Sequence, residues 1–126
     1  MHGHPKHTIT LAGGAAGGAA TLGRATGAVT WIDSSRAVVV GTNGDHSEVT
    51  TLDPETLEAI PFLARVVDAI GDRDRILILG PDAMRVELER EYVSIFHRPD
   101  RLLDVETSGT ADEADLIRRL EALTAG

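Results

Sequence analysis

The pattern of apolar and polar positions divides the chain into a simple first segment and a patterned remainder. Residues 1–27 contain two Gly-Gly-Ala-Ala units and few bulky side chains. A segment of this composition cannot bury enough apolar surface to form a core. We therefore interpret residues 1–27 as a flexible Gly/Ala-rich N-terminal tail and residues 28–126 as a single folded domain.

Three short apolar runs open the patterned part and predict β-strands. Residues 28–33 and 36–41 are rich in Val, Ile and Trp, and the continuous Val38-Val39-Val40 run is typical of a central strand. Asn43-Gly44 tolerates positive φ and predicts a hairpin turn. His46–Leu52 alternates more regularly, which predicts a third strand nearer the sheet edge. These strands are expected to form an antiparallel meander.

After Leu52 the apolar residues recur at the spacing of an α-helix. Asp53-Pro54-Glu55 combines a capping residue, a first-turn proline and an acid that complements the helix dipole. Pro61 would interrupt such a helix, so we expect a kink or a restart with Pro61 in a new first turn. The apolar positions expected on the core-facing side are Leu57, Ile60, Ala64, Val67 and Ile70.

Two further strand–helix units complete the prediction. Residues 75–79 read as a buried strand, residues 83–96 as a helix and residues 101–107 as a strand, and Thr110 with Glu113 predicts the capped start of a last helix. Strands joined through helical crossovers lie parallel, and such crossovers are right-handed. The sequence therefore predicts an α/β fold with a ribonuclease H-like mixed sheet of five strands in the order 3-2-1-4-5.

Composition narrows the possible functions. The 126-residue chain has a net charge of −8 and 3% aromatic residues, which argues against broad nucleic-acid binding because such proteins usually carry a basic surface. It contains no Cys, so disulfide and thiol chemistry are excluded, as suits a reducing cytoplasm. No apolar run is long enough for a membrane span or signal peptide. We expect a cytoplasmic protein that does not bind membranes.

Three stretches of this predicted domain resemble a known family. They read "VTWIDSSRAVVV", "RILILGPDAMRVELERE" and "LLDVETSGTADEADLI". Together they resemble the translational machinery component superfamily, which contains the middle domain of archaeal and eukaryotic peptide-chain release factors, ribosomal proteins and small bacterial single-domain relatives. The resemblance covers residues 28–123. It implies a non-enzymatic interaction domain associated with the ribosome or a translation factor.

Two departures from the family limit what the resemblance implies. Release-factor middle domains promote peptide release with a Gly-Gly-Gln loop, and the corresponding place here reads "TTLDPETLEAI". No Gln occurs anywhere in the chain, so peptide release is not carried over. The ribosomal relatives are basic, whereas this chain is acidic, which argues against rRNA binding across a broad face.

Three carboxylates support an alternative function. Asp33 ends the first predicted strand, Asp82 follows the fourth and Glu106 lies near the end of the fifth. Parallel neighbouring strands would bring these residues to one edge, where they could hold Mg²⁺ or Mn²⁺ for phosphodiester hydrolysis by a nuclease or phosphohydrolase. The competing interpretation, which we favour, is local: Asp33 closes a turn with Ser34 and Ser35, and Asp82 caps a helix.

Four arginines form the candidate contact surface for RNA or a partner. Arg73 and Arg75 flank the start of the fourth predicted strand, and Arg98 and Arg101 flank the start of the fifth. Parallel pairing would gather them at the edge opposite Asp33, where they could contact RNA phosphates or an acidic protein. Acidic residues are interleaved with them, so surface ion pairs are the favoured alternative. These acids are Asp72, Asp74, Asp100 and Asp104.

Overall fold

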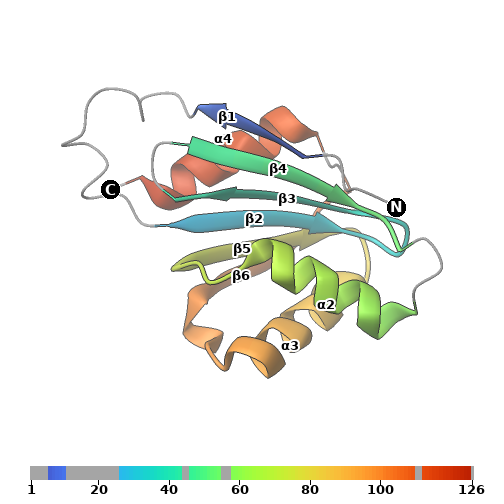
Figure 1. The fold of residues 1–126 in the computed structure, drawn as a ribbon. Helices are drawn as coiled ribbons and strands as arrows, with labels where there is room; N and C mark the ends of the chain where they lie inside the picture. Colours follow the sequence, from blue (N-terminus) through green and yellow to red (C-terminus); the bar gives the residue numbers. More distant parts are fainter. Residues whose placement is uncertain (1–5, 11–25, 44–45, 55–57, 110–111, 126) are drawn as a thin grey trace.

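The computed structural model describes residues 6–10, 26–43, 46–54, 58–109 and 112–125. Its strands form one six-stranded sheet in the order β1-β4-β3-β2-β5-β6 (Figure 1). The elements, in chain order, are β1 (Lys6–Thr10), β2 (Gly27–Ile32), β3 (Ala37–Thr42), β4 (His46–Leu52), α2 (Ala59–Ile70), β5 (Arg75–Gly80), α3 (Met84–Phe96), the 3-10 turn η2 (Pro99–Arg101), β6 (Leu102–Thr107) and α4 (Glu113–Thr124).

The predicted α/β fold and strand order are confirmed. β2, β3 and β4 pair antiparallel, with Val29 opposite Val40 and Val40 opposite Val49. β5 lies parallel to β2, and β6 lies parallel to β5. The five predicted strands therefore occur in the order 3-2-1-4-5, as the order β4-β3-β2-β5-β6. Alternation of strands with α2, α3 and α4 places the helical crossovers where the sequence predicted them.

A sixth strand lies inside the segment that we interpreted as a flexible tail. β1 pairs antiparallel with β4, from Lys6 opposite Thr50 to Thr10 opposite His46. The tail interpretation is therefore wrong for residues 6–10, and β4 is not an edge strand. The physical reason is that the outer edge of β4 offers unpaired backbone groups, which a short strand can satisfy without contributing a bulky core. Residues 1–5 and 11–25 lie outside the described residues.

Two apolar layers hold the helices against the sheet. Figure 1 shows α2 and α3 on one side of the sheet and α4 on the other. The first layer packs sheet residues such as Ile76 and Ile78 against Phe62 of α2 and Tyr92 of α3. The second layer packs the opposite face of the sheet against α4, and its members are Val29, Trp31, Val38, Val40, Val49, Leu77, Leu79, Leu116 and Leu120. Burial on both faces explains why β2, β3 and β5 are nearly continuous apolar runs.

The helix α2 begins where Pro61 predicted a first turn. It begins at Ala59, so Pro61 lies in the first turn, where a missing N–H costs little. Its buried positions are Phe62, Leu63, Val66, Val67 and Ile70. Ile60, which we expected on the core-facing side, is 59% exposed. The buried face includes Phe62 and Leu63 instead. Residues 55–57, which include Leu57, lie outside the described residues.

Close packing of the chain around Gly80 joins β5 to the end of β2. A methyl group at Gly80 would lie 2.3 Å from the backbone oxygen of Ile32, which is too close for any side chain.

The last helix, α4, begins after Asp112, whose backbone oxygen accepts a hydrogen bond from Leu116 N. The expected capping residue Thr110 lies outside the described residues. None of the described helices is long and apolar enough to cross a membrane.

Candidate functional site

Asp33 closes the turn between β2 and β3. Its Oδ1 accepts hydrogen bonds from Ser35 N at 2.8 Å, Ser35 Oγ at 2.9 Å and Arg36 N at 2.9 Å. Partial burial raises the pKa of Asp33, but the hydrogen bonds from Ser35 and Arg36, with the charge of Arg36, outweigh it and leave the pKa below its ordinary value. The Arg36 guanidinium also lies over the Trp31 ring, 5.4 Å from its centre. Asp33 therefore has the geometry of a turn residue.

The other two candidate carboxylates also bind local partners. Asp82 Oδ1 accepts a hydrogen bond from Met84 N at 2.9 Å, at the start of α3. Glu106 Oε1 accepts one from Arg119 Nη2 of α4 at 2.7 Å. Within the part of the chain that the structure describes, no group of three or more His, Cys, Asp or Glu side chains is placed to hold a metal ion. The geometry gives the nuclease alternative no support beyond the shared sheet edge.

The four candidate arginines do not form one patch. Arg75 opens β5 on the α4 side of the sheet, and its Nη1 donates a hydrogen bond to the backbone oxygen of Leu123 at 3.0 Å. It thereby satisfies a carbonyl at the C-terminal end of α4, where a cation is favoured. Arg73 and Arg98 lie on the other side, close enough for their charges to act on Tyr92 of α3.

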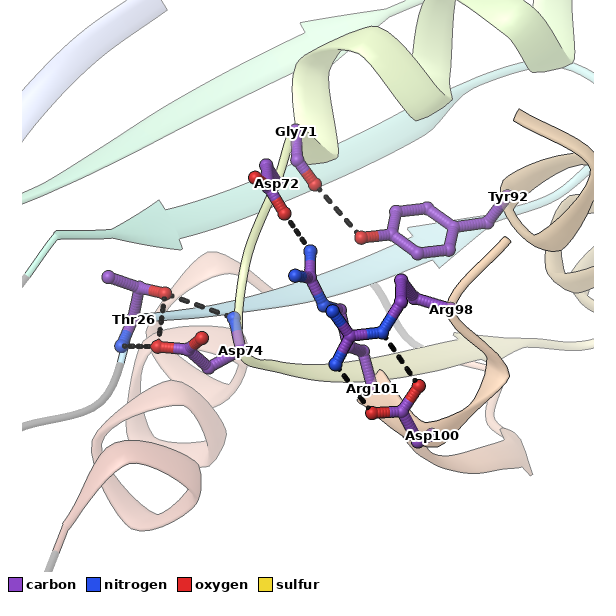
Figure 2. Close-up of polar contacts among 8 residues, drawn as sticks. All are labelled: Thr26, Gly71, Asp72, Asp74, Tyr92, Arg98, Asp100 and Arg101. Carbon is purple, nitrogen blue, oxygen red and sulfur yellow. Dashed lines mark hydrogen bonds and ion pairs between the residues drawn. The ribbon is translucent and has the colours of Figure 1, made fainter. Parts of the chain in front are cut away.

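Acidic neighbours neutralise two of these arginines (Figure 2). Arg98 donates two hydrogen bonds to Asp100, from Nε to Oδ1 at 3.0 Å and from Nη2 to Oδ2 at 2.8 Å. This bidentate contact raises the pKa of Arg98 and lowers that of Asp100. Arg101 forms an ion pair with Asp72. The ion pairs that we favoured over a basic patch are therefore present at these two positions.

The remaining two acids also make hydrogen bonds, although to backbone or hydroxyl groups. Asp74 Oδ2 accepts a hydrogen bond from Thr26 Oγ1 at 3.0 Å, and Thr26 Oγ1 accepts one from Asp74 N at 3.0 Å (Figure 2). These contacts join the start of β2 to the start of β5. Asp104 Oδ1 accepts a hydrogen bond from Val105 N at 2.9 Å. Asp74 therefore has a structural role at this end of the sheet.

Two exposed apolar side chains flank the Arg98–Asp100 pair along the chain. Ile95, in the last turn of α3, is 45% exposed, and Leu103, in β6, is 55% exposed. In the pairing of β5 with β6, Leu102 lies opposite Ile76 and Asp104 lies opposite the next residue, Leu77. Leu103 therefore has no opposite residue and is the extra residue of a β-bulge. We name the stretch from the end of α3 to the start of β6, with Ile95, Arg98, Asp100 and Leu103, the α3–β6 surface.

The sequence predicted only part of the α3–β6 surface. It selected Arg98, but neither Ile95 nor Leu103, because isolated apolar residues beside a helix end or in a strand normally read as core. The adjacent Leu102 and Leu103 in an otherwise alternating strand were the available signal, since only one of two adjacent strand residues can face the core.

No protein-family model matches this chain, and no curated protein matches it significantly.

Proposed function

We propose that the chain is a non-enzymatic cytoplasmic interaction domain that associates with the ribosome or a translation factor through the α3–β6 surface. The observation that carries this proposal is that two exposed apolar side chains, Ile95 and Leu103, precede and follow the bidentate Arg98–Asp100 pair along the chain. Protein interfaces are enriched in arginine and combine an apolar centre with a polar rim. Of the three large exposed apolar side chains among the described residues, this surface contains two, and Ile60 is the third.

The balanced charges at this end of the sheet favour a partner surface that is partly apolar and partly polar over a nucleic-acid backbone with many phosphates. Arg98 and Arg101 are balanced by Asp100 and Asp72. A charge-balanced surface contributes little long-range attraction to a polyanion. Contact with rRNA would therefore be limited to a few phosphates, with most of the binding energy coming from apolar burial.

The resemblance to translational machinery components supports the choice of partner. It rests on the stretches of β2 to β3, β5 to α3 and β6 to α4 quoted above. The strand order 3-2-1-4-5, predicted from the helical crossovers, is present in the structure, but a fold by itself does not assign a function. The proposal includes no peptide-release activity, because the chain lacks the Gly-Gly-Gln loop and any glutamine.

Ribosome co-sedimentation over a series of salt concentrations tests this proposal. Arg98→Gln is compared with the matched control Arg90→Gln, whose arginine is exposed on α3 and pairs with Glu87. If Arg98 contacts one phosphate, its removal should lower the slope of log affinity against log salt by about 0.7 to 0.9. The control should keep the wild-type slope. Absence of wild-type protein from the pellet at every salt concentration would refute ribosome association.

A further inference from the structure

A groove lies between α2 and the outer part of the sheet, on the side of the sheet covered by α2 and α3. It has a volume of about 690 Å³. This volume is within the range of roughly 300–1,000 Å³ that small-molecule sites occupy. Its lining includes Glu48, Thr50 and Leu52 of β4, Ala64, Arg65 and Asp68 of α2, and Arg73 from the loop that follows α2.

Two glycines make room for Arg73 at this groove. A methyl group at Gly41 of β3 would lie 3.0 Å from Arg73 Nη2, and one at Gly71 would lie 3.2 Å from Arg73 Nη1. The guanidinium therefore occupies the space that a side chain at Gly41 would fill. Gly41 is paired with Glu48 across the β3–β4 ladder, so Arg73 lies above the part of the sheet that forms the groove.

The Arg73 guanidinium lacks the partners that the neighbouring arginines have. Arg98 is paired with Asp100 and Arg101 with Asp72, whereas no ion pair of Arg73 is found among the residues that the structure describes. Arg73 Nε is buried and has no hydrogen-bond partner among the described residues. The residue as a whole is only partly buried, so an anion in the groove can reach the guanidinium and supply the missing counter-charge. The planar guanidinium fits a carboxylate especially well.

The acids of the groove restrict which anion it can accept. Asp68 is exposed, and no ion pair of its carboxylate occurs within the described ranges. The groove is lined by two acids, Glu48 and Asp68, and two arginines, Arg65 and Arg73, so it offers no net positive charge to a multiply charged phosphate. A ligand that places a positive group toward Asp68 and a carboxylate toward Arg73 would instead satisfy both charges.

We propose that this groove binds a small molecule that carries both a carboxylate and an ammonium group, as amino acids do. Arg73 holds the carboxylate, and Asp68 attracts the ammonium group. The apolar side chains of Leu52 and Ala64 contact the remainder of the ligand. This site is separate from the α3–β6 surface and does not depend on the proposed association with translation.

Nuclear magnetic resonance titration of the full-length ¹⁵N-labelled chain tests this site directly. The probes are glycine, leucine, glutamate and lysine, compared with acetate, methylammonium and inorganic phosphate. We expect saturable shifts of the Gly41 and Gly71 amides with at least one amino acid, and binding about tenfold tighter than acetate because a second ion pair is formed. Absence of saturable shifts with every amino acid, or tighter binding of phosphate, would overturn the proposal.

Three variants locate the binding. Arg73→Gln should abolish the shifts, because it removes the charge that holds the carboxylate. Gly41→Ala should weaken binding several-fold without changing any charge, since its methyl group displaces the guanidinium. The control Arg90→Gln should bind like the wild type, because Arg90 is exposed on α3 and pairs with Glu87. Unchanged amino-acid binding in a folded Arg73→Gln protein would also overturn the proposal.

Discussion

The hydroxyl of Tyr92 donates a hydrogen bond to the backbone oxygen of Gly71, with 3.1 Å between the two oxygens (Figure 2). Tyr92 is fully buried and stacks on Phe96, with their ring centres 4.7 Å apart. Gly71 ends α2 with φ of 70°, a conformation that glycine adopts without strain. The contact therefore ties α3 to the loop that leads from α2 into Arg73 and β5.

Titration of Tyr92 should report this contact, because the sequence contains a single tyrosine. Burial raises the pKa of Tyr92 above its ordinary value of 10.0. The contribution of neutral Tyr92 to the free energy of unfolding is therefore fully present below pH 10.0. It is lost as the pH rises through the pKa that Tyr92 has in the folded protein. We expect ultraviolet absorbance to give a higher titration midpoint in buffer than in urea. Equal midpoints would contradict the buried contact.

Removal of the Tyr92 hydroxyl should cost stability. Tyr92→Phe keeps the ring stack with Phe96 but leaves the Gly71 carbonyl without this donor. We expect a loss of about 1–2 kcal/mol in the free energy of unfolding, measured with urea. The variant should also lose the stability decrease at high pH that Tyr92 ionisation causes. A variant as stable as the wild type would show that the hydrogen bond contributes nothing.

Asp33 should act as a turn residue. Asp33→Ala removes the acceptor of three hydrogen bonds and should cost about 1 kcal/mol, whereas Asp33→Asn keeps an oxygen acceptor and should cost less. Because the pKa of Asp33 is lowered on folding, its contribution is present above pH 3.8 and is lost as pH falls through the folded pKa. Urea unfolding of both variants across this pH range measures the effect.

The same carboxylate gives a direct test of the metal alternative. Calorimetric titration of the wild type with Mn²⁺ should show no specific heat, because Asp33, Asp82 and Glu106 each bind a separate local partner. Binding that is present in the wild type and vanishes in Asp33→Asn would revive the nuclease interpretation.

Gly80 should tolerate no side chain. A methyl group there would meet the backbone oxygen of Ile32 at 2.3 Å, and neither strand can move away within a packed sheet. We expect Gly80→Ala to lower the free energy of unfolding by about 3 kcal/mol or more. Gly109→Ala is the control, because no atom lies within 4 Å of its added methyl group, and its change should stay within about 0.5 kcal/mol.

Deletion of residues 1–10 should destabilise the domain and promote association. The deletion removes β1 and leaves the outer edge of β4 unpaired. Exposed strand edges pair with other chains. We expect a lower melting temperature and larger species in analytical ultracentrifugation. An unchanged melting temperature would show that β1 contributes nothing to stability and would favour a flexible tail at this position.

Local patterns predicted the centre of this fold better than its edges. Val38-Val39-Val40 and Arg75–Leu79 are buried on both faces, so composition alone identifies them as central strands. β1 escaped detection because its pairing depends on the free edge of β4 and on long-range closure, which leave little trace in a five-residue segment. The β-bulge at Leu103 depends likewise on tertiary register.

The candidate arginines show the same limit. The alternation of β5 places Arg75 on the face of Leu77 and Leu79, toward α4, and this was readable from the sequence. Arg73 precedes the strand and follows Gly71, whose positive φ redirects the chain. Its position over Gly41 could not be predicted from spacing, because it depends on how α2 is docked against β3.

Ribosome co-sedimentation of an apolar variant tests the central claim most directly. The double substitution Ile95→Ser/Leu103→Ser removes both exposed apolar side chains of the α3–β6 surface. Ile60→Ser is the matched control, since Ile60 is 59% exposed but lies in the first turn of α2, at the end of the helix remote from Gly71. We expect the wild type and Ile60→Ser to pellet with ribosomes equally and the double variant to bind at least about tenfold more weakly. Binding of the folded double variant at wild-type strength would contradict the account.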